Sequence, residues 1–484
     1  MHNDKPQLHR SLGLWDATML VAGSMIGSGI FIVSADMSRH TGSAGWLLFL
    51  WLLSGVITLI AALCYGELAG MMPQAGGQFV YIRRAWGNCL AFLYGWTVFM
   101  VIQTGVIAAV AVAFAKFTAV FFPYFNTGNI LFQLGGISIS AAQMLAILLI
   151  VLLTWFNSRG IEGVKTIQNI FTSAKLLALF ILIAAGLWVG LKTNILTSNF
   201  DNAWSVNSMI KTDSGWIEQH ISGFAIILML GTAIIGSLFS SDAWNNVTFI
   251  AGEIKDPSRN IPRSLMLGTA MVTLLYCLAN IAYLALLPLK GSIDATTVAG
   301  QGIQFAGGDT DRVGTAAASM IFGDSSVYIM AALIMISTFG CNNGIILSGA
   351  RVYYAMALEK LFFKQAKKLN SKGVPSIALW VQAIWASLLC LSGTYGDLLD
   401  YTVFASLLFY VITISGIFIL RKREPDTERP YKVFGYPFLP ALYIVLALSI
   451  CSILLYTKTA VAGKGLLIVL LGLPIYYIFK KRSS

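Results

Sequence analysis

The sequence predicts an all-α, polytopic membrane protein. The chain has 484 residues, of which 57% are hydrophobic and only 11% carry a charged side chain. A soluble domain has about 25% charged residues. Long apolar stretches recur from one end of the chain to the other, and no polar segment is long enough to form a separate domain. We therefore expect a single membrane domain over residues 1–484.

The apolar stretches set the number of helices. A helix needs about 20 apolar residues to cross the hydrocarbon core of a bilayer. The polar stretch before residue 14 lacks the features of a cleavable signal peptide, so the first apolar segment is expected to remain in the protein. Twelve segments are predicted to span the membrane: 14–36, 45–70, 90–122, 142–158, 166–190, 223–251, 265–288, 325–356, 376–393, 398–420, 438–457 and 465–480.

The distribution of positive charge predicts the orientation. An even number of spans places both termini on the same side of the membrane. Most of the 32 lysines and arginines lie in the tails and in the connections on that side. Because positive residues gather on the cytoplasmic side, both termini are predicted to be cytoplasmic, in a cell (plasma or inner) membrane. The net charge of +11 follows from this topology and gives no reason to expect nucleic-acid binding.

Small and polar residues interrupt the first apolar segment. A helix that breaks at membrane depth exposes N–H and C=O groups that lipid cannot satisfy, so the break must be buried or line a cavity. Such exposed groups are suited to a transport site. The alternative is a close helix-packing face, because Gly23-x-x-x-Gly27 is a small-xxx-small pattern. The interrupting residues are Gly23, Ser24, Met25, Ile26, Gly27, Ser28 and Gly29.

The sixth apolar segment is interrupted in a similar way. After two glycines, it reads Ser237-Leu-Phe-Ser-Ser-Asp-Ala-Trp-Asn-Asn246. This segment lies five spans after the first one and crosses the membrane in the opposite direction. Two broken helices at corresponding places predict an inverted repeat. The repeats would be 14–190 and the inverted 223–420, followed by two peripheral helices over 438–480.

Five groups of residues then identify a resemblance. They are Gly23-Ser-Met-Ile-Gly-Ser-Gly-Ile-Phe31, Tyr65-Gly-Glu67 with Pro73-Gln-Ala-Gly-Gly77, Phe239 to Asn245 with Asn260-Ile-Pro262, Ser337-Thr-Phe-Gly340 with Asn343-Gly344, and Arg429-Pro-Tyr431 with Gly435-Tyr-Pro437. In this order they resemble the amino acid–polyamine–organocation superfamily, and most of all a bacterial-type member of its L-type amino acid transporter branch. The resemblance covers nearly the whole chain. It implies a leucine-transporter-like 5+5 inverted repeat with broken helices one and six, and transport of an amino acid by alternating access.

The resemblance also implies where the substrate binds. The N-terminus of a half-helix offers N–H donors and partial positive charge to a carboxylate, here from Ser28 and Gly29. In the family, the α-ammonium is held by backbone carbonyls near Gly23 and Met25 and around Phe239. Phe239 matches the aromatic residue that closes over the substrate, with core packing as the alternative. The predicted substrate-binding residues are Gly23, Ser24, Met25, Ile26, Gly27, Ser28, Gly29, Phe239, Ser240, Asp242 and Asn245.

Asp242 has two possible roles. A carboxylate within the membrane is costly and is a functional candidate by default. It could bond the backbone amides that the break exposes, which we favour, or it could attract the substrate ammonium. The second role would allow a cationic amino acid or a polyamine as substrate.

Lys175 lies about nine residues into the fifth span, too deep for its ammonium to reach the membrane surface easily. A buried lysine is paired, is neutral, or replaces another cation. Sodium-coupled members of the family hold an ion between spans one and eight, and in several sodium-independent members a lysine on span five takes that place. Lys175 matches this lysine, and it could contact carbonyls near Gly23 and the hydroxyl of Ser337 or Thr338. The alternatives are a lysine that only ties helices together, and a sodium site at Ser337 and Thr338.

The sequence lacks the residue patterns that catalysis, metal binding or a disulfide would need. All four histidines, at positions 2, 9, 40 and 220, lie outside the predicted spans, so we expect no enzyme activity, no metal and no cofactor. The six cysteines predict no disulfide. Heteromeric members of the family join a heavy chain through a cysteine between spans three and four. Residues 123–140 contain none, so we expect no disulfide-linked heavy chain and a monomer surrounded by membrane lipid.

The leading hypothesis is a sodium-independent exchanger of neutral L-amino acids. One alternative is a proton-coupled importer of cationic amino acids or amines. A hypothesis of another class is a sensor that binds an amino acid on a transporter fold without transporting it.

Overall fold

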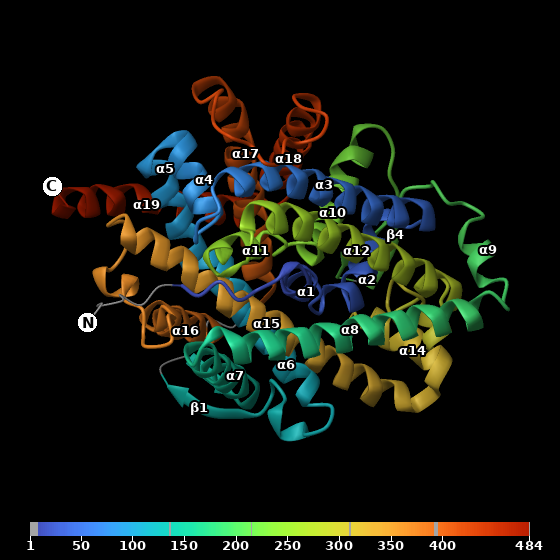
Figure 1. Ribbon diagram of the computed structural model, residues 1–484. Helices are drawn as coiled ribbons and strands as arrows, with labels where there is room; N and C mark the ends of the chain where they lie inside the picture. Colours follow the sequence, from blue (N-terminus) through green and yellow to red (C-terminus); the bar gives the residue numbers. More distant parts are fainter. Residues whose placement is uncertain (1–7, 135–136, 214, 309–310, 392–394, 484) are drawn as a thin grey trace.

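Helices make up most of the computed structural model, which describes residues 8–134, 137–213, 215–308, 311–391 and 395–483 (Figure 1). In the first half they are α1 (Leu14–Met25), α2 (Val33–Thr41), α3 (Ala44–Met71), α4 (Gln78–Trp86), α5 (Asn88–Thr97), α6 (Gln103–Thr118), α7 (Ala141–Ser158), α8 (Ile161–Gly190) and α9 (Ile195–Asn199). In the second half they are α10 (Phe224–Ser240), α11 (Asn246–Phe249), α12 (Pro257–Leu286), α13 (Val298–Gln301), α14 (Val313–Phe322), α15 (Ser326–Leu358), α16 (Ser376–Leu391), α17 (Tyr395–Arg423), α18 (Phe438–Thr457) and α19 (Thr459–Ser483).

Within the described ranges, nine helical segments are long and apolar enough to cross a membrane. They overlap nine of the twelve predicted spans. The other three predictions fall on shorter helices: α1 and α2 replace the first span, α10 and α11 replace the sixth, and α16 has 16 residues. The nine segments are Ala44–Met71, Asn88–Thr118, Ala141–Ser158, Gly163–Gly190, Pro257–Leu286, Val313–Leu358, Thr402–Arg423, Phe438–Thr457 and Ala462–Lys480.

Two of the shorter segments are the helices whose sequences predicted a break. The first ends at Met25 and resumes at Val33, with one 3-10 turn between (Gly29–Phe31). The second ends at Ser240 and resumes at Asn246. A third irregularity, a π-helical turn over Val98–Ile102, joins α5 to α6 without ending the helix.

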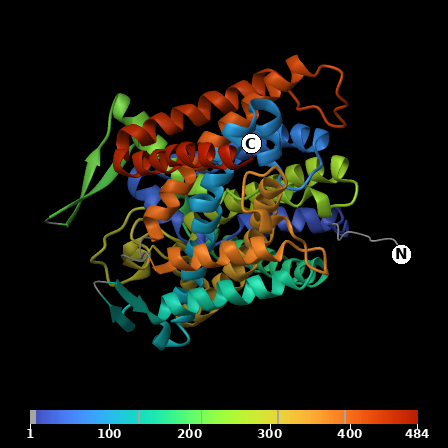
Figure 2. The ribbon, with the colours of Figure 1, turned by 90° about the vertical axis from the view of Figure 1, so that its left-hand side faces the viewer.

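The structure also contains two antiparallel hairpins, which differs from the all-α prediction. They are formed by β1 (Ile130–Leu134) with β2 (Ile137–Ser140), and by β3 (Asn207–Thr212) with β4 (Gly215–His220). Both lie in connections between apolar segments, where a search for spans carries no information on strands. Figure 2 shows both hairpins on the same side of the molecule and the N-terminus on the opposite side. We call these the hairpin side and the N-terminal side.

The first broken helix lies at the centre of the bundle. Helix α1 packs against α12, α8 and α15, and α10 packs against α2 and α3 (Figure 1). Nine of the twelve residues of α1 are buried, including Thr18 and Ser24. Polar groups of the first break are therefore surrounded by protein, which is the condition under which a broken helix is tolerated in a membrane.

Candidate functional site

The first break leaves a set of backbone carbonyls without partners in their own helix. At Ile26 the backbone turns to an extended conformation (φ −78°, ψ 93°), after its N–H has bonded to Ala22. The carbonyls of Gly23, Met25 and Ile26 are instead approached by side chains from other helices. The break is thus a buried cluster of acceptors rather than a flexible loop.

The second break is formed without glycine. Helix α10 ends at Ser240, and Ala243 adopts a left-handed conformation with φ of 64°. The chain then enters α11, where the Thr248 hydroxyl donates to the carbonyl oxygen of Asn245 at 2.7 Å. Left-handed backbone is unfavourable for alanine, so the surrounding contacts must hold this turn in place.

The two breaks touch each other. A Cβ atom added at Gly29 would lie 2.2 Å from the Ser240 hydroxyl oxygen and 3.2 Å from the Ser240 Cα. Only glycine allows the two backbones to come this close. Of the predicted binding residues, Gly29 and Ser240 are therefore brought together from opposite halves of the chain.

Tyr276 of α12 joins the breaks through hydrogen bonds, and the sequence did not indicate it. Its hydroxyl lies 3.1 Å from the carbonyl oxygen of Met25 and 3.1 Å from that of Ser240. The residue is 1% exposed. A hydroxyl has one proton, so it can satisfy only one of the two carbonyls at a time. The Met25 carbonyl also accepts a hydrogen bond from the Gly27 N–H at 3.0 Å, so the Ser240 carbonyl is the one that a further donor could serve.

Lys175 of α8 reaches the first break, the partner that the resemblance implied. Its Nζ lies 2.5 Å from the Gly23 carbonyl oxygen, 2.7 Å from that of Ile26 and 3.4 Å from that of Ser337. The side chain is buried, and no acidic group pairs with it in the described part of the chain. Carbonyl oxygens around one positive charge are also how proteins coordinate hard metal cations.

The two neighbouring hydroxyl residues of α15 differ in orientation. Ser337 donates to the carbonyl oxygens of Ile26 and Gly27, both at 3.0 Å, so it lies beside Lys175. Thr338 instead donates to Ile334 of its own helix at 2.7 Å. The structure therefore brings Ser337 to the break, through its hydroxyl and its carbonyl, and turns the Thr338 hydroxyl away.

Other side chains of α8 and α15 hold the first break in place. A Cβ at Gly23 would lie 2.3 Å from both the Gln168 amide nitrogen and the Thr172 hydroxyl oxygen. Gly23 is therefore also a close-packing position, as the small-xxx-small pattern allowed. On the opposite side, the Cys341 thiol lies 3.1 Å from the Ser24 carbonyl oxygen.

The remaining predicted residues of the second break face other elements. The Tyr410 hydroxyl of α17 donates to Asp242 Oδ1 at 2.5 Å. The Asn245 amide donates to Gln78 of α4 at 3.0 Å. Phe239 is half-buried and packs against the apolar core. None of these three has a hydrogen bond to the first break among the described residues.

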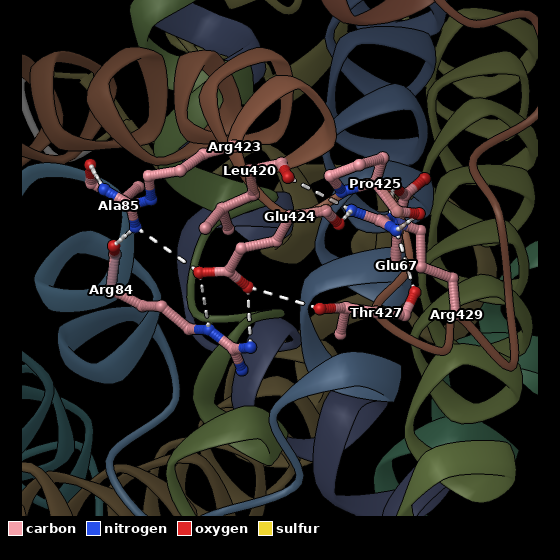
Figure 3. A network of polar contacts seen from close by, with 9 residues as sticks. All are labelled: Glu67, Arg84, Ala85, Leu420, Arg423, Glu424, Pro425, Thr427 and Arg429. Carbon is pink, nitrogen blue, oxygen red and sulfur yellow. Dashed lines mark hydrogen bonds and ion pairs between the residues drawn. The ribbon is translucent and has the colours of Figure 1, made fainter.

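A network of ion pairs closes the N-terminal side. Glu67 of α3 accepts hydrogen bonds from Arg421 at 2.9 and 2.6 Å and from the Val433 amide at 2.7 Å. Figure 3 shows Arg429 beside Glu67, with its guanidinium donating to the carbonyl oxygens of Leu420 and Glu424. The connection between α17 and α18 is thereby fastened to α3.

Two further arginines, Arg84 and Arg351, form additional ion pairs. Arg84 of α4 pairs with Glu424 at 2.6 Å (Figure 3), and hydrogen bonds from this guanidinium lower the pKa of the Glu424 carboxyl. Arg351 of α15 pairs with Glu253 at 2.9 Å, and both side chains are buried. Glu67 and Arg351 thus hold helix ends together at a distance from the two breaks.

The described residues contain no group of three or more histidine, cysteine or acidic side chains that could hold a metal ion. All six cysteines are free. The chemistry of the site therefore rests on backbone groups, a lysine, a tyrosine and hydroxyls. Such a set can bind a molecule that carries both a cation and an anion.

Comparison with known proteins identifies relatives over the full length of the chain. A family described as amino acid permease matches residues 12–478. The serine/threonine exchanger SteT of Bacillus subtilis is 30% identical, over 100% of both chains. The mouse large neutral amino acids transporter small subunit 2 is 29% identical over 97% of this chain and 81% of its own length. The mouse Asc-type amino acid transporter 1 is 27% identical over 98% and 82%.

Proposed function

The chain belongs to the amino acid permease family, and on that premise we propose that it is a sodium-independent exchanger of neutral L-amino acids. As a member of this family it is a multi-pass membrane transporter and not an enzyme. The observation that carries the proposal is the contact between the two helix breaks, joined by Tyr276 and flanked by Lys175.

We propose that the amino acid binds where the breaks meet. Its ammonium would supply a further donor to the carbonyls of Met25 and Ser240, in addition to the Tyr276 hydroxyl and to the Gly27 N–H that bonds the Met25 carbonyl. Its carboxylate would accept hydrogen bonds from the N–H groups around Ser28 and Gly29, at the start of the outer half-helix. Phe239 would cover the substrate.

Sodium independence rests on Lys175. Its ammonium already lies within hydrogen-bonding distance of three carbonyl oxygens, between α1 and α15. A sodium ion placed there would need the same oxygens and would meet the repulsion of a fixed positive charge. The Ser337 hydroxyl donates to the carbonyls of Ile26 and Gly27, so it competes for the same oxygens that a sodium ion would need.

We propose an architecture of twelve spans. It would combine the nine long helices with α1–α2, α10–α11 and α16 as the three further spans. We propose two inverted five-span repeats over 14–190 and 223–420, with peripheral helices over 438–480. The abundance of lysine and arginine on the N-terminal side supports cytoplasmic termini in a cell membrane. A monomer without a disulfide-linked heavy chain is part of the same proposal.

Ligand binding tests the substrate class. The purified full-length protein is heated in detergent with each of the twenty L-amino acids or with polyamines, in sodium and in potassium buffer. A ligand that binds the folded state raises the unfolding temperature. Neutral amino acids should do so equally in both buffers, and their amides and N-acetyl derivatives should not. Stabilisation only by polyamines, or only with sodium, would contradict the proposal.

A further inference from the structure

A small cavity lies beside the second break. Its volume is about 30 Å³, which is room for about two water molecules. Asp242, Asn245 and Asn246 line it, together with Gln103 of α6 and Ile345 of α15. Most side-chain pockets in proteins are apolar with a few placed polar groups. This cavity fits that description, because its wall also includes Val98, Ile102, Val106 and Phe249.

The cavity lies within reach of a molecule bound at the breaks. Asp242 comes two residues after Ser240, whose carbonyl faces Tyr276. On the other wall, Ile345 lies four residues after Cys341, which contacts the first break. Four residues of helix rise about 6 Å. A short side chain that leaves the breaks toward the N-terminal side would therefore enter the cavity.

One group on the cavity wall has no hydrogen-bond partner. Asn246 is 2% exposed, and its amide nitrogen has no partner among the described residues. Asp242 already has the Tyr410 hydroxyl, the Ala243 amide and the Ser406 hydroxyl as neighbouring donors, and no lysine, arginine or histidine of the described chain pairs with it. A carboxylate has about four acceptor sites. The wall thus presents one unpaired buried donor beside a carboxylate that can accept one further hydrogen bond.

A hydroxyl group matches this pair of partners. It can donate to Asp242 and at the same time accept from Asn246. An ammonium has only donors and would leave the Asn246 amide unpaired, and the long chain of a lysine exceeds the volume of two waters. A methyl group would also leave the Asn246 amide unpaired, and a buried unpaired polar group is unfavourable.

A second cavity on the other side of Asp242 does not offer the same match. It measures about 20 Å³, and its wall combines apolar side chains such as Ile57 and Leu238 with Thr58 and Ser241, but it does not include Asn246. A hydroxyl placed there would find the carboxylate without the amide donor.

We propose that the cavity beside Asn246 receives the side chain of a short hydroxylated amino acid, with Asp242 accepting from the hydroxyl and Asn246 donating to it. This inference rests on the proposed function, because it assumes that the α-ammonium and α-carboxylate bind at the breaks. It assigns Asp242 to substrate selection in addition to its bond with Tyr410.

Matched ligands test the inference on the unmodified protein. Dissociation constants are measured for L-serine against L-alanine, and for L-threonine against the equally shaped L-valine. A site built for a hydroxyl discriminates strongly against an analogue that lacks it. We expect the hydroxylated member of each pair to bind at least about tenfold more tightly. Equal binding within both pairs would overturn the inference, and so would tighter binding of L-lysine or cadaverine than of L-serine.

A variant locates the effect in the cavity. Asn246→Ala should weaken binding of L-serine about tenfold and leave L-alanine unchanged, so that the preference disappears. Asn342→Ala is the matched control, because this buried asparagine of α15 also has an unpaired amide oxygen but is not among the residues that line the cavity. It should keep the preference. A preference that survives in Asn246→Ala would overturn the assignment.

The outcomes separate this inference from the proposed function. If L-alanine and L-leucine stabilise the protein but L-serine has no advantage, the inference fails and the proposed function stands. If no neutral amino acid binds the unmodified protein, both fail.

Discussion

Replacement of Tyr276 by phenylalanine removes the one side chain that joins the two breaks. The hydroxyl lies 3.1 Å from each of two buried carbonyl oxygens. The ring itself is unchanged, so its packing, including the edge contact with Trp51 at 5.4 Å between ring centroids, should persist. The expected effect is therefore that of a lost hydrogen bond and not of a cavity.

The magnitude follows from the buried acceptors. Leaving a buried acceptor without its donor costs about 1–3 kcal/mol. Because the hydroxyl can serve one carbonyl fully at a time, we count this cost once. At about 1.4 kcal/mol for each factor of ten, substrate affinity should fall about 5- to 150-fold if the breaks must be aligned before the amino acid binds. The unfolding temperature of the ligand-free protein should fall as well.

Tyr283→Phe supplies the control for this variant. Tyr283 lies two turns further along α12, is 1% exposed like Tyr276, and has a hydroxyl with no partner among the described residues. Removal of an unpaired buried hydroxyl should be neutral or slightly stabilising. Binding and unfolding temperature are measured for both variants. Equal behaviour of Tyr276→Phe and Tyr283→Phe in both assays would refute the reasoning.

Three further predictions concern other parts of the site and the N-terminal side. Lys175→Met should lower sodium-independent exchange at least about tenfold while the protein still folds, because the carbonyls around the ammonium lose their donor; unchanged kinetics would remove the proposed role. Gly29→Ala should destabilise the protein by about 1–3 kcal/mol, because the added methyl group would clash with Ser240 of the second break. Gly163→Ala is the control, because this position has open space around it, and it should not destabilise the protein. Equal effects of the two substitutions would contradict the close approach of the breaks. Hydrogen bonds from Arg84 make the pKa of Glu424 lower in the folded than in the unfolded protein. The pair therefore stabilises the folded protein at pH values above the unfolded pKa. This stabilisation is lost as the pH falls through the pKa of the folded state. Glu424→Gln should thus lower the free energy of unfolding at pH 7 by less than about 1 kcal/mol, seen as a slightly lower unfolding temperature, and should have no effect at strongly acid pH. The same loss at both pH values would exclude the mechanism.

The sequence predicts the helices and the breaks well because both depend on local composition. Nine predicted spans correspond to long apolar helices. The two spans predicted to be interrupted are the ones that the structure divides, at Ile26 and at Ala243. Glycines and polar residues within an apolar run are sufficient to indicate such a division.

The contacts across the site depend on distant residues and are harder to predict. Tyr276 lies in an otherwise ordinary apolar helix, and its partners are backbone carbonyls, which every residue possesses. Ser337 and Thr338 are neighbours, and only the rotation of α15 decides which one faces the first break. Asp242 is paired with a tyrosine 168 positions away, which local sequence does not reveal.

Lys175 is an intermediate case. Its depth in the span indicated a buried ammonium, and the resemblance indicated the first break as its partner. The structure provides that partner through the carbonyls of Gly23 and Ile26. The expected hydroxyl partner on α15 is replaced by the Ser337 carbonyl, because the Ser337 hydroxyl is engaged by the break itself.

Counterflow tests the central claim of exchange most directly. Proteoliposomes that contain the purified protein are preloaded with an unlabelled neutral amino acid, and uptake of the labelled amino acid is measured without sodium and without a proton gradient. The account predicts that preloading accelerates uptake many-fold over empty vesicles, and that added sodium changes nothing. Uptake that is independent of preloading, or that requires sodium or a proton gradient, would contradict it.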